Sequence, residues 1–173
     1  MKLEYTLTIN DYFNYHFYMF LTSNEAKRSL YIQWFSMVVL CLIVAFVFYN
    51  AYGFEIGVIL MLFYTFIMLI FYPKFFNYQC KKRILKFVKK TYGESKNVRF
   101  EVTEYELFCA SDVSEFKIKN SAFKKAVKTD ENLFLMADNG IGIVLKSDKD
   151  SISLARNFGL EPQNFSDKRL KNV

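Results

Sequence analysis

Two long apolar segments with one charged residue between them dominate the hydrophobic pattern of this chain. Between Arg28 and Lys74 the only charged residue is Glu55. A bilayer core about 30 Å thick needs about 20 helical residues, so each segment is long enough to cross it. Neither segment has the polar stripe of a helix on a soluble core. The pattern predicts a membrane-spanning helical hairpin over residues 30–73, with spans at about 31–52 and 56–72.

The charges on the two sides of this hairpin are unequal. Lys27 and Arg28 precede it and the turn near Glu55 has no Lys or Arg, whereas a basic run follows the second segment before the first acid, Glu94. By the positive-inside rule, a multi-pass protein with both termini in the cytoplasm is expected. A secretory signal peptide is disfavoured, because about 30 polar and aromatic residues precede the apolar run and the run exceeds an h-region in length.

The N-terminal part, residues 1–29, changes its hydrophobic period once. Strict alternation over residues 3–9 predicts a half-buried strand, and Thr8 or Asn10 can cap a helix over residues 11–21. That helix is rich in aromatic residues, which lie either at the lipid interface or against the cytoplasmic domain. With the aromatic residues at the ends of the spans, the candidate interfacial set is Tyr12, Phe13, Tyr15, Phe17, Trp34, Tyr52 and Tyr72.

A basic amphipathic helix is predicted directly after the spans, over residues 74–93. Apolar residues recur there at helical spacing, and Gly93 is a plausible stop. Each cation near an anionic leaflet contributes about 1 kcal/mol, so the helix is expected to lie beside lipid headgroups. The candidate anionic-lipid contacts are Lys74, Lys81, Lys82, Arg83, Lys86, Lys89 and Lys90.

From residue 97 the period falls to two, which is typical of strands. Six short strands are predicted as an antiparallel meander, with an Asn139-Gly140 hairpin turn between the last two. Ser147 and Asp150 have capping-box spacing before a final helix that stops at Gly159. The fold class expected is a membrane α-helical hairpin plus a cytoplasmic α+β module. This module, over residues 94–160, is a small barrel or a pair of packed sheets, and a polar tail covers residues 161–173.

The count of strands before a closing helix suggests a pleckstrin-homology-like module. If the strand at residues 3–9 joins it as a seventh strand, the membrane hairpin is an insertion within that module. Whether this pairing forms is left open by the pattern.

This layout resembles a known family. The strand Leu3-Glu4-Tyr5-Thr6-Leu7-Thr8, an aromatic helix, two spans, a basic helix and a meander that ends in a helix are together similar to the YcxB-like bacterial membrane proteins. The resemblance implies a pleckstrin-homology-like C-terminal domain and a bacterial inner (cell) membrane location. It brings no catalytic residues.

No constellation of catalytic, metal or cofactor residues stands out in the sequence. His16, the only histidine, has its nearest acid five residues away, and Cys41, Cys80 and Cys109 have no metal-ligand spacing. An enzyme is therefore disfavoured. Nucleic acid is disfavoured as a partner as well, because topology already explains the basic run.

Three classes of function follow from these observations. The leading hypothesis is a non-catalytic interaction domain held against the inner membrane, with the bilayer and an unknown membrane or cytoplasmic protein as partners. The alternatives are a toxin or bacteriocin immunity protein and a subunit of a larger membrane complex. The domain surface offered to a partner would include Lys117, Lys119, Lys124 and Lys125.

Overall fold

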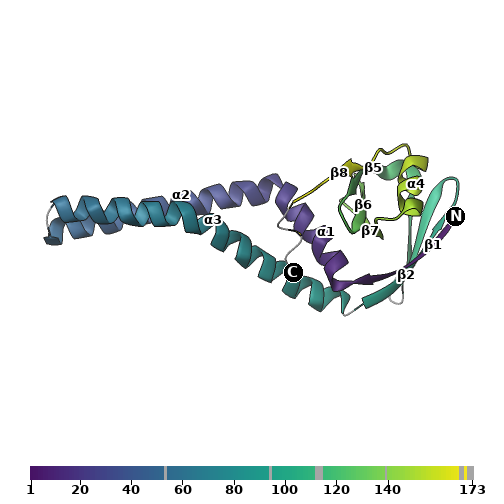
Figure 1. Ribbon diagram of the computed structural model, residues 1–173, viewed down its shortest axis with the longest axis horizontal. Coiled ribbons are helices and arrows are strands. Elements are labelled where there is room, and N and C mark those ends of the chain that lie inside the picture. Colours follow the sequence, from purple (N-terminus) through teal and green to yellow (C-terminus); the bar gives the residue numbers. More distant parts are fainter. Residues whose placement is uncertain (53, 94, 112–114, 139, 168–169, 171–173) are drawn as a thin grey trace. The chain divides into compact units, whose positions relative to one another are not determined.

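The computed structural model of the protein describes residues 1–52, 54–93, 95–111, 115–138, 140–167 and 170 (Figure 1). The chain has an α+β arrangement of helices and two mainly antiparallel sheets. In chain order the elements are β1 (Lys2–Thr8), α1 (Ile9–Thr22), α2 (Asn24–Tyr52), α3 (Phe54–Tyr92), β2 (Ser95–Val102), β3 (Glu106–Ser111), β4 (Glu115–Lys119), the 3-10 turn η1 (Asn120–Ala122), β5 (Phe123–Lys128), β6 (Asn132–Ala137), β7 (Gly142–Lys146), α4 (Lys149–Asn157) and β8 (Gln163–Asn164).

The chain divides into two compact units. The first contains residues 1–18 and 85–173, and the second contains residues 19–84. The first unit holds both sheets and α4, whereas the second consists mainly of α2 and most of α3. The sheet unit is therefore discontinuous in sequence.

The first sheet has the strand order β1-β2-β3-β4, and all its neighbours are antiparallel. The N-terminal strand pairs with β2 over its whole length, from Lys2 opposite Glu101 to Thr8 opposite Ser95. The alternation predicted for residues 3–9 is confirmed, because Leu3 and Leu7 are buried on one face of the sheet. The open question of whether this strand joins the C-terminal strands is thus answered: it does.

The second sheet has the order β7-β6-β5-β8, in which only the β5–β8 pair is parallel. The expected single meander of six strands is therefore wrong: after β4 the chain passes through η1 and starts a second sheet at β5. Of the two arrangements expected, the pair of sheets is the one observed. Gly140, in the predicted turn between β6 and β7, has the positive φ of 78° that favours glycine, and Asn139 lies outside the described residues.

The central strand β6 is buried on both faces. Leu133, Phe134 and Leu135 have no exposed surface. On one face, Tyr15 and Tyr18 of α1 place their rings 5.5 and 5.7 Å from the Phe134 ring. On the other face α4 contacts β6. Because helices cover both faces, β6 is a continuous apolar run, as strands covered on both faces usually are.

The aromatic residues of α1 mostly face the protein interior. Phe13, Tyr15 and Phe17 are buried, and their rings pack against other aromatic side chains of the first unit. The interfacial expectation is wrong for these three residues, since a buried ring has no surface left for lipid. Tyr12 is half-buried and its ring stacks on that of Tyr92 at 4.1 Å between centroids.

The second unit consists mainly of two helices that run side by side (Figure 1). Gly57 lies against the backbone of Tyr49, so close that an added Cβ would be 3.1 Å from the Tyr49 Cα. Both α2 and α3 contain a stretch long and apolar enough to cross a membrane, judged by length and composition. The second predicted span and the predicted basic helix form one helix, α3, with Pro73 inside it.

Local signals at the helix ends are partly as predicted. Gly93 has φ of 74° and its N–H donates to the Lys89 carbonyl, which ends α3 as expected. Gly159 and Leu160 close α4 with the two backbone hydrogen bonds of a Schellman motif. The capping box of α4, however, is formed by Asp148 and Ser151 rather than by Ser147 and Asp150. The prediction was one residue too early because several cap-forming residues are adjacent.

Candidate functional site

The candidate lipid contacts of the basic segment all lie on α3. Six of the seven are exposed, whereas Lys81 is half-buried and has other contacts within the protein. The exposed members are Lys74, Lys82, Arg83, Lys86, Lys89 and Lys90.

Five of these cations share one side of the helix. At about 3.6 residues per turn, positions 82, 83, 86, 89 and 90 fall within roughly a third of the helix circumference. Val88, which has no exposed surface, lies on the opposite side of the same helix. We call the group Lys82, Arg83, Lys86, Lys89 and Lys90 the basic face of α3.

No member of the basic face forms an ion pair with a carboxylate in the described part of the chain. Two acids of the first sheet, Glu4 and Glu101, pair within that sheet. Glu101, for example, pairs with Lys2 at 3.1 Å and with Arg99 at 2.7 Å. The basic face is thus a cluster of solvated positive charges, and its field is available to an anionic partner.

The remaining candidate interfacial aromatics differ in their surroundings. Trp34 is half-buried. Tyr72 is buried, and its hydroxyl donates a hydrogen bond of 2.8 Å to Oε1 of Gln33 on α2. The interfacial expectation is therefore wrong for Tyr72, because its ring and hydroxyl serve helix packing. The side chain of Tyr52 lies outside the described part of the chain.

The four lysines proposed for the domain surface are all exposed but belong to two sheets. Lys117 and Lys119 lie on β4, whereas Lys124 and Lys125 lie on β5. Lys124 approaches Asp138 at 3.8 Å, and Lys125 lies 6.0 Å from the centre of the Tyr18 ring. They do not form a single charged row along one strand.

The histidine and cysteines take part in packing. Nε2 of His16 lies 3.2 Å from the Tyr92 hydroxyl, and its ring meets that of Phe87 edge to face. Burial lowers the pKa of His16, so the ring is neutral at pH 7. Burial raises the pKa of the Cys109 thiol to about 12, which removes its nucleophilic character. Among the described residues, no three His, Cys, Asp or Glu side chains are grouped to hold a metal.

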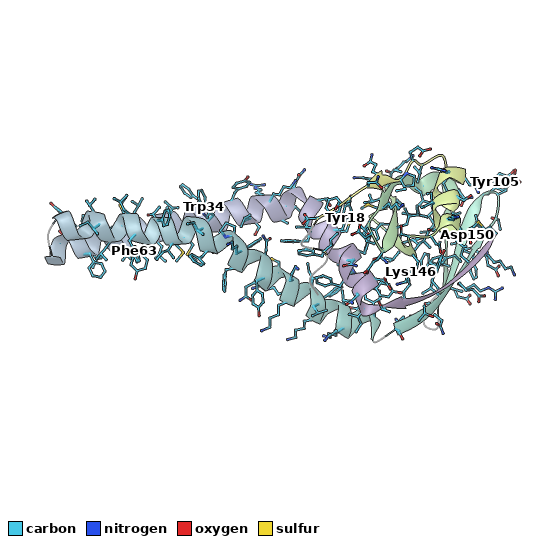
Figure 2. The ribbon with its side chains drawn as sticks, in the orientation of Figure 1. Tyr18, Trp34, Phe63, Tyr105, Lys146 and Asp150 are labelled. Atoms are coloured by element: carbon cyan, nitrogen blue, oxygen red, sulfur yellow. The ribbon has the colours of Figure 1, made fainter. Side chains whose placement is uncertain are left out.

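A buried polar cluster is the feature that the sequence did not reveal. The carboxylate of Asp11 accepts hydrogen bonds from Lys146 Nζ at 2.6 and 2.7 Å and from Asn132 Nδ2 at 2.6 Å. The Thr8 N–H and hydroxyl also donate to it. Lys146 lies at the end of β7 (Figure 2). Every oxygen of this carboxylate is paired, which is the arrangement of a structural rather than a catalytic acid.

The cluster determines the charge state of Asp11. Burial by itself raises the pKa of this carboxyl, but the hydrogen bonds from Lys146, Asn132 and Thr8 outweigh it and hold the pKa below the ordinary value. Asp11 is therefore ionised at neutral pH and holds α1 to β7. An acid in the first turn of a helix is a common capping signal, so its long-range partners could not be read from the sequence.

Comparisons of the chain with protein-family models, with curated proteins and with solved structures found no match.

Proposed function

We propose that the protein is a two-span protein of the bacterial inner membrane whose sheet-containing unit is a non-catalytic interaction module at the cytoplasmic face. The basic face of α3 binds anionic lipid headgroups, and the module binds a membrane or cytoplasmic protein. The layout of elements supports a place in the YcxB-like family. The observation that carries the proposal is the basic face itself, five exposed cations that follow an apolar helix segment in the same helix.

The membrane part of the proposal rests on the exposure of apolar side chains. In the most apolar 18-residue stretch of α2 no residue is buried, and in that of α3 only 6% are. The core helices of soluble proteins are mostly buried, so these helices do not fit that class. Phe63, which projects away from α3, is 61% exposed (Figure 2). Apolar surface of this extent requires a hydrophobic solvent or a protein partner. Lipid acyl chains can cover the apolar side chains on all sides of the two helices.

The lipid part rests on charge. Each Lys or Arg near an anionic leaflet contributes about 1 kcal/mol. Lys82, Lys86 and Lys89 point to the same side of α3 and none is neutralised by a described carboxylate. The same cations of α3 therefore serve two purposes. They keep this end of the helix in the cytoplasm by the positive-inside rule, and there they contact anionic headgroups of the inner leaflet.

Native mass spectrometry of the full chain in a neutral detergent tests this function. The protein is titrated with phosphatidylglycerol or with phosphatidylcholine, and bound lipids are counted. We expect a preference for phosphatidylglycerol that falls by at least about tenfold in the triple variant K82E/K86E/K89E, because three attractive charges become repulsive.

The matched control is K117E/K119E/K124E, which makes the same change of net charge on exposed lysines of β4 and β5. It is expected to keep the preference of the unmodified chain. Equal losses in both triple variants would mean that only net charge matters, and no preference in the unmodified chain would remove the basis of the proposal.

A further inference from the structure

The sheet-containing unit contains a partly open apolar cavity of about 240 Å³. Its walls come from the inner face of the first sheet, from α1, from β7 and from the end of α3. The volume exceeds the roughly 150 Å³ of a cavity that takes up benzene and is below the roughly 300 Å³ at which drug-sized sites begin. The space therefore suits a small organic molecule.

The wall formed by β2 carries a cation at a position where the alternation of the strand predicts an apolar side chain. Along β2, Lys96 belongs to the same inward-facing row as Val98 and Phe100, both of which are buried. Lys96 is half-buried, and it forms no ion pair with any described carboxylate. Its Nζ lies 5.7 Å from the centre of the Tyr92 ring. The described lining residues include no acid, so Lys96 is the charged group of the cavity.

Three tyrosines and Ser111 form the rest of the polar lining. Tyr12 stacks on Tyr92 with ring planes 9° apart, and Tyr15 is the third tyrosine of the wall. Burial raises the pKa of Tyr12 to about 12, so its phenol is a neutral hydrogen-bond donor. A Cβ at Gly142 would overlap the Tyr15 hydroxyl, and this glycine therefore lets Tyr15 lie against β7.

We propose that this cavity binds a small monocarboxylate with an apolar body. The apolar body lies among Val98, Phe100 and Cys109, and the carboxylate pairs with Lys96 Nζ. Charge complementarity selects an anion, because a neutral guest would leave the ammonium without a counter-ion and a cationic guest would be repelled. This proposal does not depend on lipid binding by the basic face of α3, because none of the residues of that face lines the cavity.

Equilibrium dialysis of the full chain in phosphatidylcholine nanodiscs, against 2-naphthoate or decanoate, tests the cavity. Empty nanodiscs give the amount of each probe that partitions into lipid. We expect saturable binding of one or both probes beyond this amount. The variant K96M keeps most of the length of the side chain and removes its charge. It should weaken binding of the carboxylate by about tenfold, which corresponds to one charged hydrogen bond.

Two controls separate loss of charge from loss of fold. K119M removes an exposed lysine from β4 and should leave binding unchanged. The neutral probe 2-naphthalenemethanol should bind K96M at least as tightly as the unmodified chain, because K96M has no ammonium to leave without a counter-ion, and its binding also shows that K96M is folded. Binding of decanoate alone identifies an alkyl guest, and binding of naphthoate alone identifies an aromatic one.

Either of two results would overturn the assignment: uptake of both carboxylates equal to that of empty nanodiscs, or equal affinity of K96M and the unmodified chain for them. Replacing phosphatidylcholine by phosphatidylglycerol changes the surroundings of the basic face but not the cavity. Naphthoate uptake corrected for partition is therefore expected to be the same in both lipids.

Discussion

Asp11 and Lys146 are joined by two short contacts, from the Lys146 ammonium to Oδ1 at 2.6 Å and to Oδ2 at 2.7 Å. Asp11 lies in the first turn of α1 and is only 1% exposed, whereas Lys146 ends β7 and is partly in solvent. The pair therefore fixes an N-terminal helix to a C-terminal strand. Burial removes the Asp11 carboxylate from water, and its hydrogen-bond partners offset the free-energy cost of that lost hydration.

Removal of one partner of this pair should destabilise the sheet-containing unit. K146M leaves the buried carboxylate without its cation, and we expect a loss of about 3 kcal/mol in the free energy of unfolding. K149M, at an exposed position three residues later, should cost under about 0.5 kcal/mol. Urea unfolding of the detergent-solubilised chain, followed by near-ultraviolet circular dichroism, measures both. Similar midpoints for the two variants would contradict a structural role for the pair.

The same cluster predicts how stability depends on pH. The pKa of Asp11 in the folded chain is below its ordinary value of 3.8, so the unfolded state binds more protons at acidic pH. The stabilisation is complete above about pH 3.8 and is lost as the pH falls through the lower, folded-state pKa. In D11N this acid-induced loss should be smaller. Unfolding midpoints from pH 2 to 6 test it, and parallel curves for D11N and the unmodified chain would count against it.

The position of the α4 cap gives a second prediction of stability. The Asp148 carboxylate accepts from the Ser151 N–H at 2.7 Å and from the Tyr5 hydroxyl at 2.7 Å, whereas Ser147 Oγ is buried without a partner among the described residues. D148A should therefore cost about 1–2 kcal/mol, while S147A should be neutral or stabilising. Thermal unfolding of the two variants decides between the observed cap and the one expected from sequence spacing. A larger loss in S147A would favour the latter.

The proposed topology predicts which cysteines an impermeant reagent can reach. In a chain without its three native cysteines, N50C near the turn should react with a membrane-impermeant maleimide on intact cells. K119C in β4 should react only after the inner membrane is permeabilised. Spheroplasts remove the outer barrier, and labelling of a known cytoplasmic protein reports leakage. Reaction of K119C in sealed spheroplasts would overturn the orientation.

Local patterns predicted most of the elements. The period of two identified the strands that form β1 and β2, and glycine at 93 and 159 ended helices where expected. These features depend on a few neighbouring residues, for which period and φ are decisive. The cap at Asp148 was misplaced by one residue because neighbouring Ser and Asp residues offer equivalent local hydrogen bonds.

The candidate site was predicted unevenly. The basic face was found from sequence because charge spacing along a helix is a local property. The burial of Phe13, Phe17 and Tyr72 was not found, since an aromatic ring suits a lipid interface and a protein core equally well. Lys96 was not singled out in the sequence, because only its partial burial in the row of Val98 and Phe100 distinguishes it from an exposed lysine.

The sequence by itself determined the two apolar helices, the basic segment and the period of each strand, because these depend on residues a few positions apart. The tertiary structure alone decided that β1 pairs with β2 although α1, α2 and α3 stand between them in the chain, that the strands divide into two sheets, and that Asp11 meets Lys146. Such contacts join residues about 90 to 135 positions apart. They form because burial of the shared core outweighs the entropy of closing so long a loop, a balance that no local pattern contains.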